Sequence, residues 1–394
     1  MVYLPHSALT MKFPALLKSD VTGGIVLLLC VIVSLIIANS PLRNGFSHLL
    51  SARIDAGIIS LSVLSWINDG LMTVFFFLVG LEIKQEILDG HLSGAKRAAL
   101  PVIAALGGAL LPALIYWLVN SGTTAGKGWG IPMATDIAFS LGVLSLLGSV
   151  VPRGLRAFLS ALAVVDDLLA ILVIAIFYAT GIHWFNMGIA AILFLMLMLM
   201  NKSGIKHPVF FIIPGIVMWY FIHHSGVHAT IAGVLTALTI PAKSKKGSPL
   251  KKLEHYLSRP VNYVIMPLFA LANTNITFTA DMISGLGSGL SLGIIAGLCL
   301  GKPLGVTISS LLAVKTGIGT LPHDVNRKLM AGAGILAGIG FTMSIFITLL
   351  SFGNTMQAES AKLAIVLASL IAGVGGYLYL RKQLVIPVPD KTRS

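Results

Sequence analysis

Two adjacent aspartates, Asp166 and Asp167, lie in the middle of a long apolar run over residues 155–179. A carboxylate near the centre of a bilayer is unfavourable by about 3 kcal/mol or more. Two of them side by side also repel each other, which favours a retained proton on at least one. Such a pair is typical of a site at which a positive ion binds and from which it is released again. These residues therefore predict the binding of a proton or a small cation.

Few other ionisable residues lie deep in the apolar runs. Of the fourteen acidic residues, Asp136 joins the pair well inside a predicted membrane span, and Lys302 is the basic residue at comparable depth. If all four side chains ionise, two negative charges stay uncompensated. That balance fits a site that is protonated when it is empty and holds a monovalent cation when it is loaded.

The two aspartates cannot have the same surroundings, because neighbouring residues of a helix project about 100° apart. We expect one of them to face a water-filled cavity and the other to face Lys302. In a purely structural alternative, the buried pair of Lys302 and an aspartate only holds the bundle together. Asp136 and Lys302 are also suited to balance the positive and negative ends of half-helices, where a span is interrupted in mid-membrane.

A second group of titratable residues lies near the ends of the spans. Glu82 and Glu86 are four residues apart on one helix face, Glu254 and His255 follow a basic segment, and His228 precedes a further span. Histidine titrates near neutral pH, and clustered carboxylates titrate higher than isolated ones. These residues are candidates for pH sensing or gating at the mouth of a funnel. Ordinary interfacial charges with extended lysine side chains fit the same pattern.

The elements that must hold these residues are predicted to be membrane-spanning helices. The chain of 394 residues is 56% hydrophobic and 10% charged, with a mean hydropathy of +0.93, whereas soluble domains are about 25% charged. An apolar run of about 20 residues crosses the hydrocarbon core. Twelve such runs occur, of which the seventh is short: 21–38, 64–83, 98–119, 129–149, 155–179, 184–200, 208–222, 226–241, 260–278, 289–314, 327–351 and 360–380.

We therefore predict an all-α polytopic membrane protein with about 12 transmembrane helices. Residues 21–381 should form a single transmembrane domain, between an N-terminal segment over residues 1–20 and a tail over residues 382–394. Cys30 and Cys299 lie in apolar runs, so we expect them to act as small hydrophobic residues rather than as a disulfide or a pair of metal ligands.

Two predicted spans, the fourth and the eleventh, contain helix-breaking residues. The fourth has Pro132 shortly before Asp136, and the eleventh has four glycines within residues 332–340. Irregular backbone persists inside a membrane only where protein or water satisfies its polar groups. Two interrupted spans in separate halves indicate a transporter with inverted-topology repeats and a binding site at the interruptions. For the eleventh span alone, glycines that merely permit close helix packing explain the pattern equally well.

Two longer connecting segments stand out. Residues 44–62 alternate patchily around Asp55–Gly57, which predicts a small β-hairpin, although an irregular loop fits as well. Residues 242–259 form a basic segment that we expect to be a cytoplasmic loop.

The distribution of basic residues predicts the orientation in the membrane. With twelve spans, alternate loops lie on one side, and 22 of the 27 Lys and Arg residues fall on that side. Positively charged loops stay in the cytoplasm, so both termini are expected to be cytoplasmic and the 44–62 hairpin periplasmic. The net charge of +13 is thus a topology signal and not a sign of nucleic-acid binding. Contact with anionic membrane lipids is a secondary expectation.

Several motifs resemble those of the NhaA family of bacterial sodium/proton antiporters. They follow in order between about Asp20 and Arg381, and their combination is highly specific. The motifs are Trp66–Asp69 (WIND), Phe77–Lys84 (FLVGLEIK), Ile131–Phe139 (IPMATDIAF), Ala163–Leu168 (AVVDDL), Ser225–Thr230 (SGVHAT), Leu253–His255 (LEH), Gly301–Gly305 (GKPLG) and Gly338–Phe346 (GIGFTMSIF). One position departs from the pattern, because Gln85 stands where the family often has arginine.

The resemblance implies a role for each matching residue. Asp167 would bind the cation at the floor of a cavity, and Asp166 would pair with Lys302, so that these three residues bind the cation and carry protons. Asp136 and Thr135 would support the crossed, interrupted helices. Residues for pH sensing or gating would be Glu82, Glu86, His228, Glu254 and His255.

The function expected from these features is pH-regulated, electrogenic antiport that exports Na⁺ or Li⁺ while protons enter, by alternating access at Asp166 and Asp167. The resemblance also implies a homodimer in the bacterial inner membrane, joined through the 44–62 hairpin. The transported ions are the ligands expected, with no cofactor and no enzymatic activity. A Na⁺-coupled symporter of an organic anion on a related fold is the alternative. An intramembrane protease is disfavoured, since its two aspartates would stand on separate helices.

Overall fold

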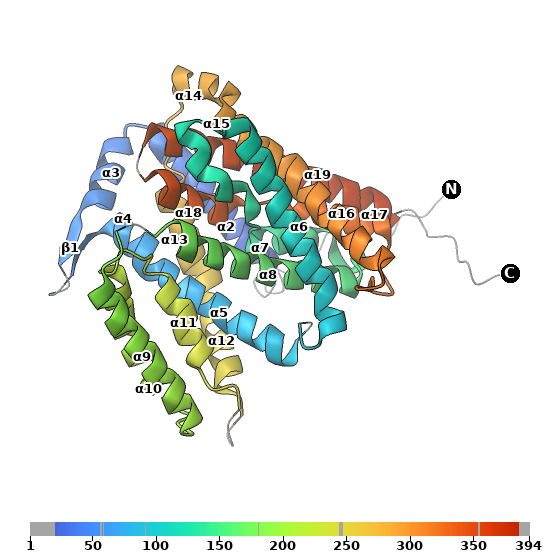
Figure 1. Cartoon of the computed structure of the whole chain (residues 1–394). Coiled ribbons are helices and arrows are strands. Elements are labelled where there is room, and N and C mark those ends of the chain that lie inside the picture. Colours follow the sequence, from blue (N-terminus) through green and yellow to red (C-terminus); the bar gives the residue numbers. More distant parts are fainter. Residues whose placement is uncertain are drawn as a thin grey trace, which may run out of the picture.

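The structure is a computed structural model that describes residues 20–385, apart from residues 56, 58, 91, 180, 244–246 and 354. The described part is a bundle of helices with one two-stranded hairpin, and α9 (Trp184–Lys202) and α10 (Val209–His223) form a pair at the edge of the bundle (Figure 1). Six helical segments are long and apolar enough to cross a membrane: Val63–Asp89, Ala98–Asn120, Arg153–Phe177, Trp184–Lys202, Gly289–Lys315 and Met356–Leu384.

Three bent pairs of helices are together long and apolar enough to count as further spans. In each pair a short break separates two apolar helices: α2 (Asp20–Ala38) with α3 (Arg43–Ser51), η2 (Thr124–Met133) with α7 (Ile137–Leu146), and α17 (Arg327–Ala337) with α18 (Phe341–Phe352). The bends are 112°, 45° and 43°. The last two breaks lie in the predicted fourth and eleventh spans, so the interruptions expected there are present.

By length and composition, at most nine spans are therefore found in the described residues, against twelve predicted. The other three predicted spans correspond to shorter helices. These are α10 (Val209–His223), α11 (Ile231–Thr239), and α12 (Pro249–Pro260), which continues through the π-helical turn η4 (Val261–Ile265) into α13 (Met266–Asn273). The predicted run at 226–241 begins with a turn, so only its second part is helical.

The remaining elements complete the chain. They are β1 (Arg53–Asp55), β2 (Ser60–Ser62), α4 (Val63–Ser65), η1 (Trp66–Leu71), α5 (Met72–Asp89), α6 (Ala95–Asn120), η3 (Gly148–Val150), α8 (Arg153–Phe177), α9 (Trp184–Lys202), α14 (Ala280–Ser284), η5 (Gly285–Gly287), α15 (Gly289–Ala296), η6 (Gly297–Gly301), α16 (Lys302–Lys315) and α19 (Met356–Val385). The predicted tail over residues 382–394 is in part helical, because α19 extends to Val385.

Two predicted connecting segments are more ordered than expected. The two strands of the hairpin occupy only residues 53–55 and 60–62, with Arg53 opposite Ser62, because α3 fills the first half of the 44–62 segment. In the basic segment, α12 begins at Pro249. Ser248 caps it by accepting a hydrogen bond from the Lys251 amide at 3.2 Å, and proline at a first helical position is a usual start signal.

Close contact between α6 and α16 places the buried lysine. A Cβ atom on Gly305 would lie 2.2 Å from the carbonyl oxygen of Gly107, so the two backbones touch. Small residues allow this approach in membrane helices. Lys302 is the first residue of α16, and its side chain is fully buried.

Candidate functional site

The site is built where the two interrupted spans meet in the middle of the bundle. Between η2 and α7 the backbone is extended, and the Asp136 amide donates a hydrogen bond to Ile339 O at 2.7 Å. The Ser140 hydroxyl in α7 donates to Leu336 O of α17 at 3.0 Å. Each break therefore satisfies polar backbone groups that the other span exposes, as irregular backbone inside a membrane requires.

Asp136 joins the N-termini of two half-helices. Its Oδ1 accepts from the Phe139 amide of α7 at 3.0 Å, and its Oδ2 accepts from the Thr342 amide of α18 at 3.1 Å. The Thr342 hydroxyl also donates to Oδ2, at 2.5 Å. Asp136 is only 1% exposed. Because helix N-termini carry partial positive charge, this carboxylate lies where the sequence suggested that it balances a half-helix.

Lys302 lies at the opposite, negative end of a half-helix. Its Nζ donates to the carbonyl of Met133, the last residue of η2, and forms a salt bridge with Asp166 Oδ2 at 2.6 Å. The Thr135 hydroxyl is 2.6 Å from the same Asp166 oxygen and 2.9 Å from Ala337 O. All three side chains are buried. Asp166 is thus held by an ammonium group and a hydroxyl.

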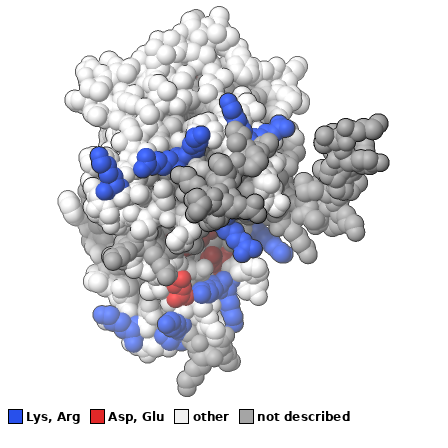
Figure 2. Space-filling view, turned by 90° about the vertical axis from the view of Figure 1, so that its right-hand side faces the viewer, with Lys and Arg blue, Asp and Glu red and all other residues white. Residues whose placement is uncertain are grey.

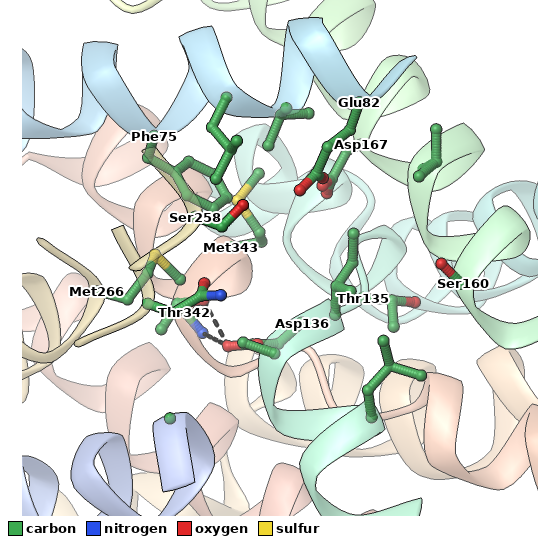
Figure 3. A pocket seen from close by; sticks show the side chains of 18 of the residues that line it. Phe75, Glu82, Thr135, Asp136, Ser160, Asp167, Ser258, Met266, Thr342 and Met343 are labelled. Atoms are coloured by element: carbon green, nitrogen blue, oxygen red, sulfur yellow. Dashed lines mark hydrogen bonds between the residues drawn. The ribbon is translucent and has the colours of Figure 1, made fainter. Parts of the chain in front are cut away.

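Asp167 has a contrasting environment. It is 1% exposed, yet neither of its carboxylate oxygens has a hydrogen-bond partner among the described residues. It lines a cavity of about 350 Å³ together with Thr135, Asp136 and Glu82. Figure 3 shows the carboxylates of Asp167 and Glu82 pointing toward each other, from α8 and α5. Two free carboxylate oxygens at a cavity wall are hard ligands of the kind that small cations prefer.

The cavity continues from these residues toward the end of α5 and the second half of α12. Its wall there contains Gln85, Glu86, Glu254 and Ser258. Burial is the main cause that raises the pKa of Glu254; Glu86 raises it further, and Lys251 and His255 oppose the shift. Three glutamates thus line one passage that leads to Asp167, counting Glu82.

Two predicted residues lie apart from this passage. His228 lies in the turn before α11, where its Nε2 is 3.2 Å from Tyr178 O, and His255 is exposed on α12. Neither belongs to the described residues that line the cavity. Within the described part of the chain, no three His, Cys, Asp or Glu side chains stand close enough to hold a metal ion. A cation at Asp167 therefore needs further oxygens, from hydroxyls, backbone or water.

Thr342 is the site residue whose role the sequence did not reveal. It lies inside the Gly338–Phe346 motif, and the available signal was a hydroxyl directly after the glycine-rich break. Its hydroxyl and amide both bind Asp136 across more than 200 residues of chain, so its role depends on tertiary structure.

Replacing Thr342 with Val should lower the free energy of unfolding by about 1–3 kcal/mol, because a buried carboxylate loses a hydrogen bond. Thr342→Ser keeps the hydroxyl and should retain most of the stability. Thermal unfolding in detergent measures both variants. Equal melting temperatures for the Val and Ser variants would contradict a role for this hydroxyl.

Comparisons with known proteins all lead to one family of transporters. A family model described as "Na+/H+ antiporter 1" matches residues 14–380. The "Na(+)/H(+) antiporter NhaA 2" of Flavobacterium johnsoniae is 55% identical over 93% of this chain and 92% of its own length. The "Na(+)/H(+) antiporter NhaA" of Flavobacterium psychrophilum is 47% identical over 95% and 97%, and that of Cytophaga hutchinsonii is 45% identical over 97% and 98%.

Proposed function

Since this chain belongs to the NhaA family of Na⁺/H⁺ antiporters and exchanges Na⁺ for H⁺, we propose that the exchange takes place at Asp167. The protein is a multi-pass membrane transporter of a family of the bacterial cytoplasmic membrane, and not an enzyme. The expectation of a symporter for organic anions is thereby set aside.

The observation that carries this proposal is the state of the Asp167 carboxylate. It is buried, faces the cavity, and has no hydrogen-bond partner among the described residues. A proton or a Na⁺ ion can each neutralise it, but they compete for the same oxygens. Exchange follows if only the neutralised forms change the side to which the site faces. Li⁺, which is also small, should be carried, and K⁺ poorly.

Asp166 and Lys302 are the second part of the proposed site. Their salt bridge of 2.6 Å involves the residue next to Asp167. A cation bound at Asp167 therefore repels the positive charge of Lys302 and favours release of a proton from this pair. A proton released from this pair, in addition to one from Asp167, makes the cycle electrogenic. Each net charge then gains about 2.3 kcal/mol per 100 mV of membrane potential.

The cavity is proposed to open to the cytoplasm, with both termini on that side. Several basic residues lie at helix ends. Lys202 and Lys315 are the last residues of α9 and α16, and Arg327 is the first residue of α17. Figure 2 shows Lys and Arg side chains gathering on one face of the molecule, with few acidic side chains between them. Cytoplasmic loops carry such an excess of positive charge.

The β1–β2 hairpin is proposed to join two copies of the chain. Its strands project from the bundle at the side of α3 (Figure 1), and Ile54 on β1 is 49% exposed. An exposed strand edge is a template for pairing with another strand. A homodimer through this hairpin would place the two cavities in separate protomers.

Ion-loaded proteoliposomes test the proposed exchange. After a proton gradient has been formed across the membrane, Na⁺ or Li⁺ should collapse it, and K⁺ should have little effect. A gradient that survives Na⁺ at every pH from about 6.5 to 8.5 would contradict the proposal. Uptake of a labelled organic anion that depends on Na⁺ would favour the symporter instead.

Glu254 should affect Na⁺ binding more strongly as pH rises. Because burial raises its pKa, the side chain stays neutral up to a higher pH than a free glutamate does, and it becomes charged as pH rises through that raised value. Glu254→Gln should therefore raise the KM for Na⁺ about threefold at alkaline pH, an effect typical of a partly screened charge. At a lower pH, where more of Glu254 is protonated, the effect should be smaller.

Initial rates of exchange at several Na⁺ concentrations and two pH values provide the measurement. Glu359→Gln is the matched control, since Glu359 pairs with Lys362 at the start of α19 and does not line the cavity. An equal rise in KM at both pH values would exclude titration of Glu254 as the cause.

A further inference from the structure

A groove on the outer surface of the bundle lies behind the crossing of the interrupted helices. It has a volume of about 300 Å³, and its walls are α2, α7 and α19. Three glycines, Gly24, Gly142 and Gly373, are among the residues that line it. A Cβ atom on Gly373 would lie in ordinary van der Waals contact, with the nearest heavy atom at 3.6 Å, so a methyl group would fit there without a clash. Apart from Ser369 and Tyr377, the other lining side chains are apolar.

The floor of the groove belongs to the machinery of the crossing. Ser369 lines the groove and accepts a hydrogen bond from the Phe341 amide, at the start of α18, at 3.2 Å. Phe139 of α7 also lines it, and its ring centroid is 6.0 Å from that of Phe341. A molecule that fills the groove would therefore contact residues that pack against α7 and α18, the two half-helices whose N-termini bind Asp136.

Two exposed arginines lie beyond the lining residues at one end of the groove. Along α19 the lining residues Ser369, Gly373 and Tyr377 recur every four positions, and the next position on this stripe is the exposed Arg381. Where α7 ends at the same end of the groove, the Arg156 side chain donates to Gly148 O at 2.9 Å and remains exposed. A guanidinium has five N–H donors, so Arg156 retains donors for another acceptor.

The length of the groove matches one leaflet of a bilayer. From Ser369 to Leu378 the lining covers nine helical steps, which is about 14 Å at 1.5 Å per residue. Half of the ~30 Å hydrocarbon core is about 15 Å. Tyr377 at the basic end has the amphipathic side chain that is enriched at the membrane interface. The groove thus has an apolar part of acyl-chain depth and a cationic end at headgroup level.

We propose that this groove binds one anionic phospholipid, with an acyl chain between α7 and α19 and the phosphate at Arg381 and Arg156. Charge complementarity favours an anionic over a zwitterionic headgroup, because the basic end offers cations and no acidic partner among the residues that line the groove. The lipid would fill the gap behind the crossing and so stabilise the two half-helices.

Binding of phosphatidylglycerol to the delipidated full-length protein tests the proposal, and it is independent of the exchange assay. Wild-type protein should retain phosphatidylglycerol in native mass spectrometry and gain several degrees in melting temperature, and phosphatidylcholine should do less. Gly373→Leu fills the groove and should reduce bound phosphatidylglycerol at least about fivefold. Gly375→Leu is the matched control, because Gly375 lies on the same helix, is exposed, and does not line the groove.

Arg381→Gln should remove most of the preference for the anionic lipid, whereas Arg259→Gln on α12 should not. Unchanged phosphatidylglycerol binding in Gly373→Leu, or an unchanged preference in Arg381→Gln, would overturn the proposal. If Gly373→Leu fails to fold, photo-crosslinking of a phosphatidylglycerol probe to wild type decides. Label concentrated on residues 139–146 and 369–378 supports the site, and label spread evenly over lipid-facing helices refutes it.

Discussion

Asp167→Asn is expected to lower Na⁺-driven proton exchange at least about 100-fold while the protein stays folded. The change removes the charge that a cation must neutralise, and an interaction of about 3 kcal/mol with a charged group corresponds to two powers of ten. Both oxygens of Asp167 lack hydrogen-bond partners among the described residues, so asparagine breaks no internal hydrogen bond. The melting temperature should therefore not fall.

Exchange in proteoliposomes and thermal unfolding measure the two parts of this prediction. Asp55→Asn is the matched control, since Asp55 lies exposed at the end of β1 and is not among the described residues that line the cavity. It should leave exchange unchanged. Full exchange activity in Asp167→Asn would rule out the proposed role of this residue, and a large loss of stability would indicate a structural one.

Lys302→Ala should have the largest effect on stability. It removes the partner of Asp166 at a fully buried position and the donor to Met133 O. Breaking a buried ion pair by deleting one member typically lowers the free energy of unfolding by about 3–5 kcal/mol. Lys302→Met combined with Asp166→Leu removes both charges and should recover much of that loss. Thermal and denaturant unfolding in detergent compare the three proteins.

The same variant separates two routes for the second proton. If the proton of the Lys302–Asp166 pair is transported, the exchange that remains in Lys302→Ala should be electroneutral, and an imposed membrane potential should no longer change its rate. The wild type should respond to the potential. A variant that exchanges slowly but still responds to the potential to the same degree would show that the second proton does not depend on Lys302.

Much of the fold and part of the site could be predicted from the sequence. Apolar runs, the proline before Asp136 and the glycines of residues 332–340 predicted helices and two interrupted spans, and the structure confirms both interruptions. These features are local, because the bilayer imposes helix formation on any long apolar run. The motifs likewise indicated the family, which the comparisons confirm. Helix lengths were less predictable, since tertiary packing decides where short helices such as α11 begin.

The sequence by itself determined an all-helical membrane protein with an aspartate pair at mid-membrane. Acidic residues inside a long apolar run can be recognised from their positions in the sequence. Only the tertiary structure decided the surroundings of each aspartate. Asp166 meets Lys302 and Asp167 meets the cavity. The tertiary structure also places Thr342 next to Asp136, and it places His228 and His255 outside the passage that leads to Asp167. Adjacent helix residues point in different directions, and what each one meets depends on segments distant in the chain.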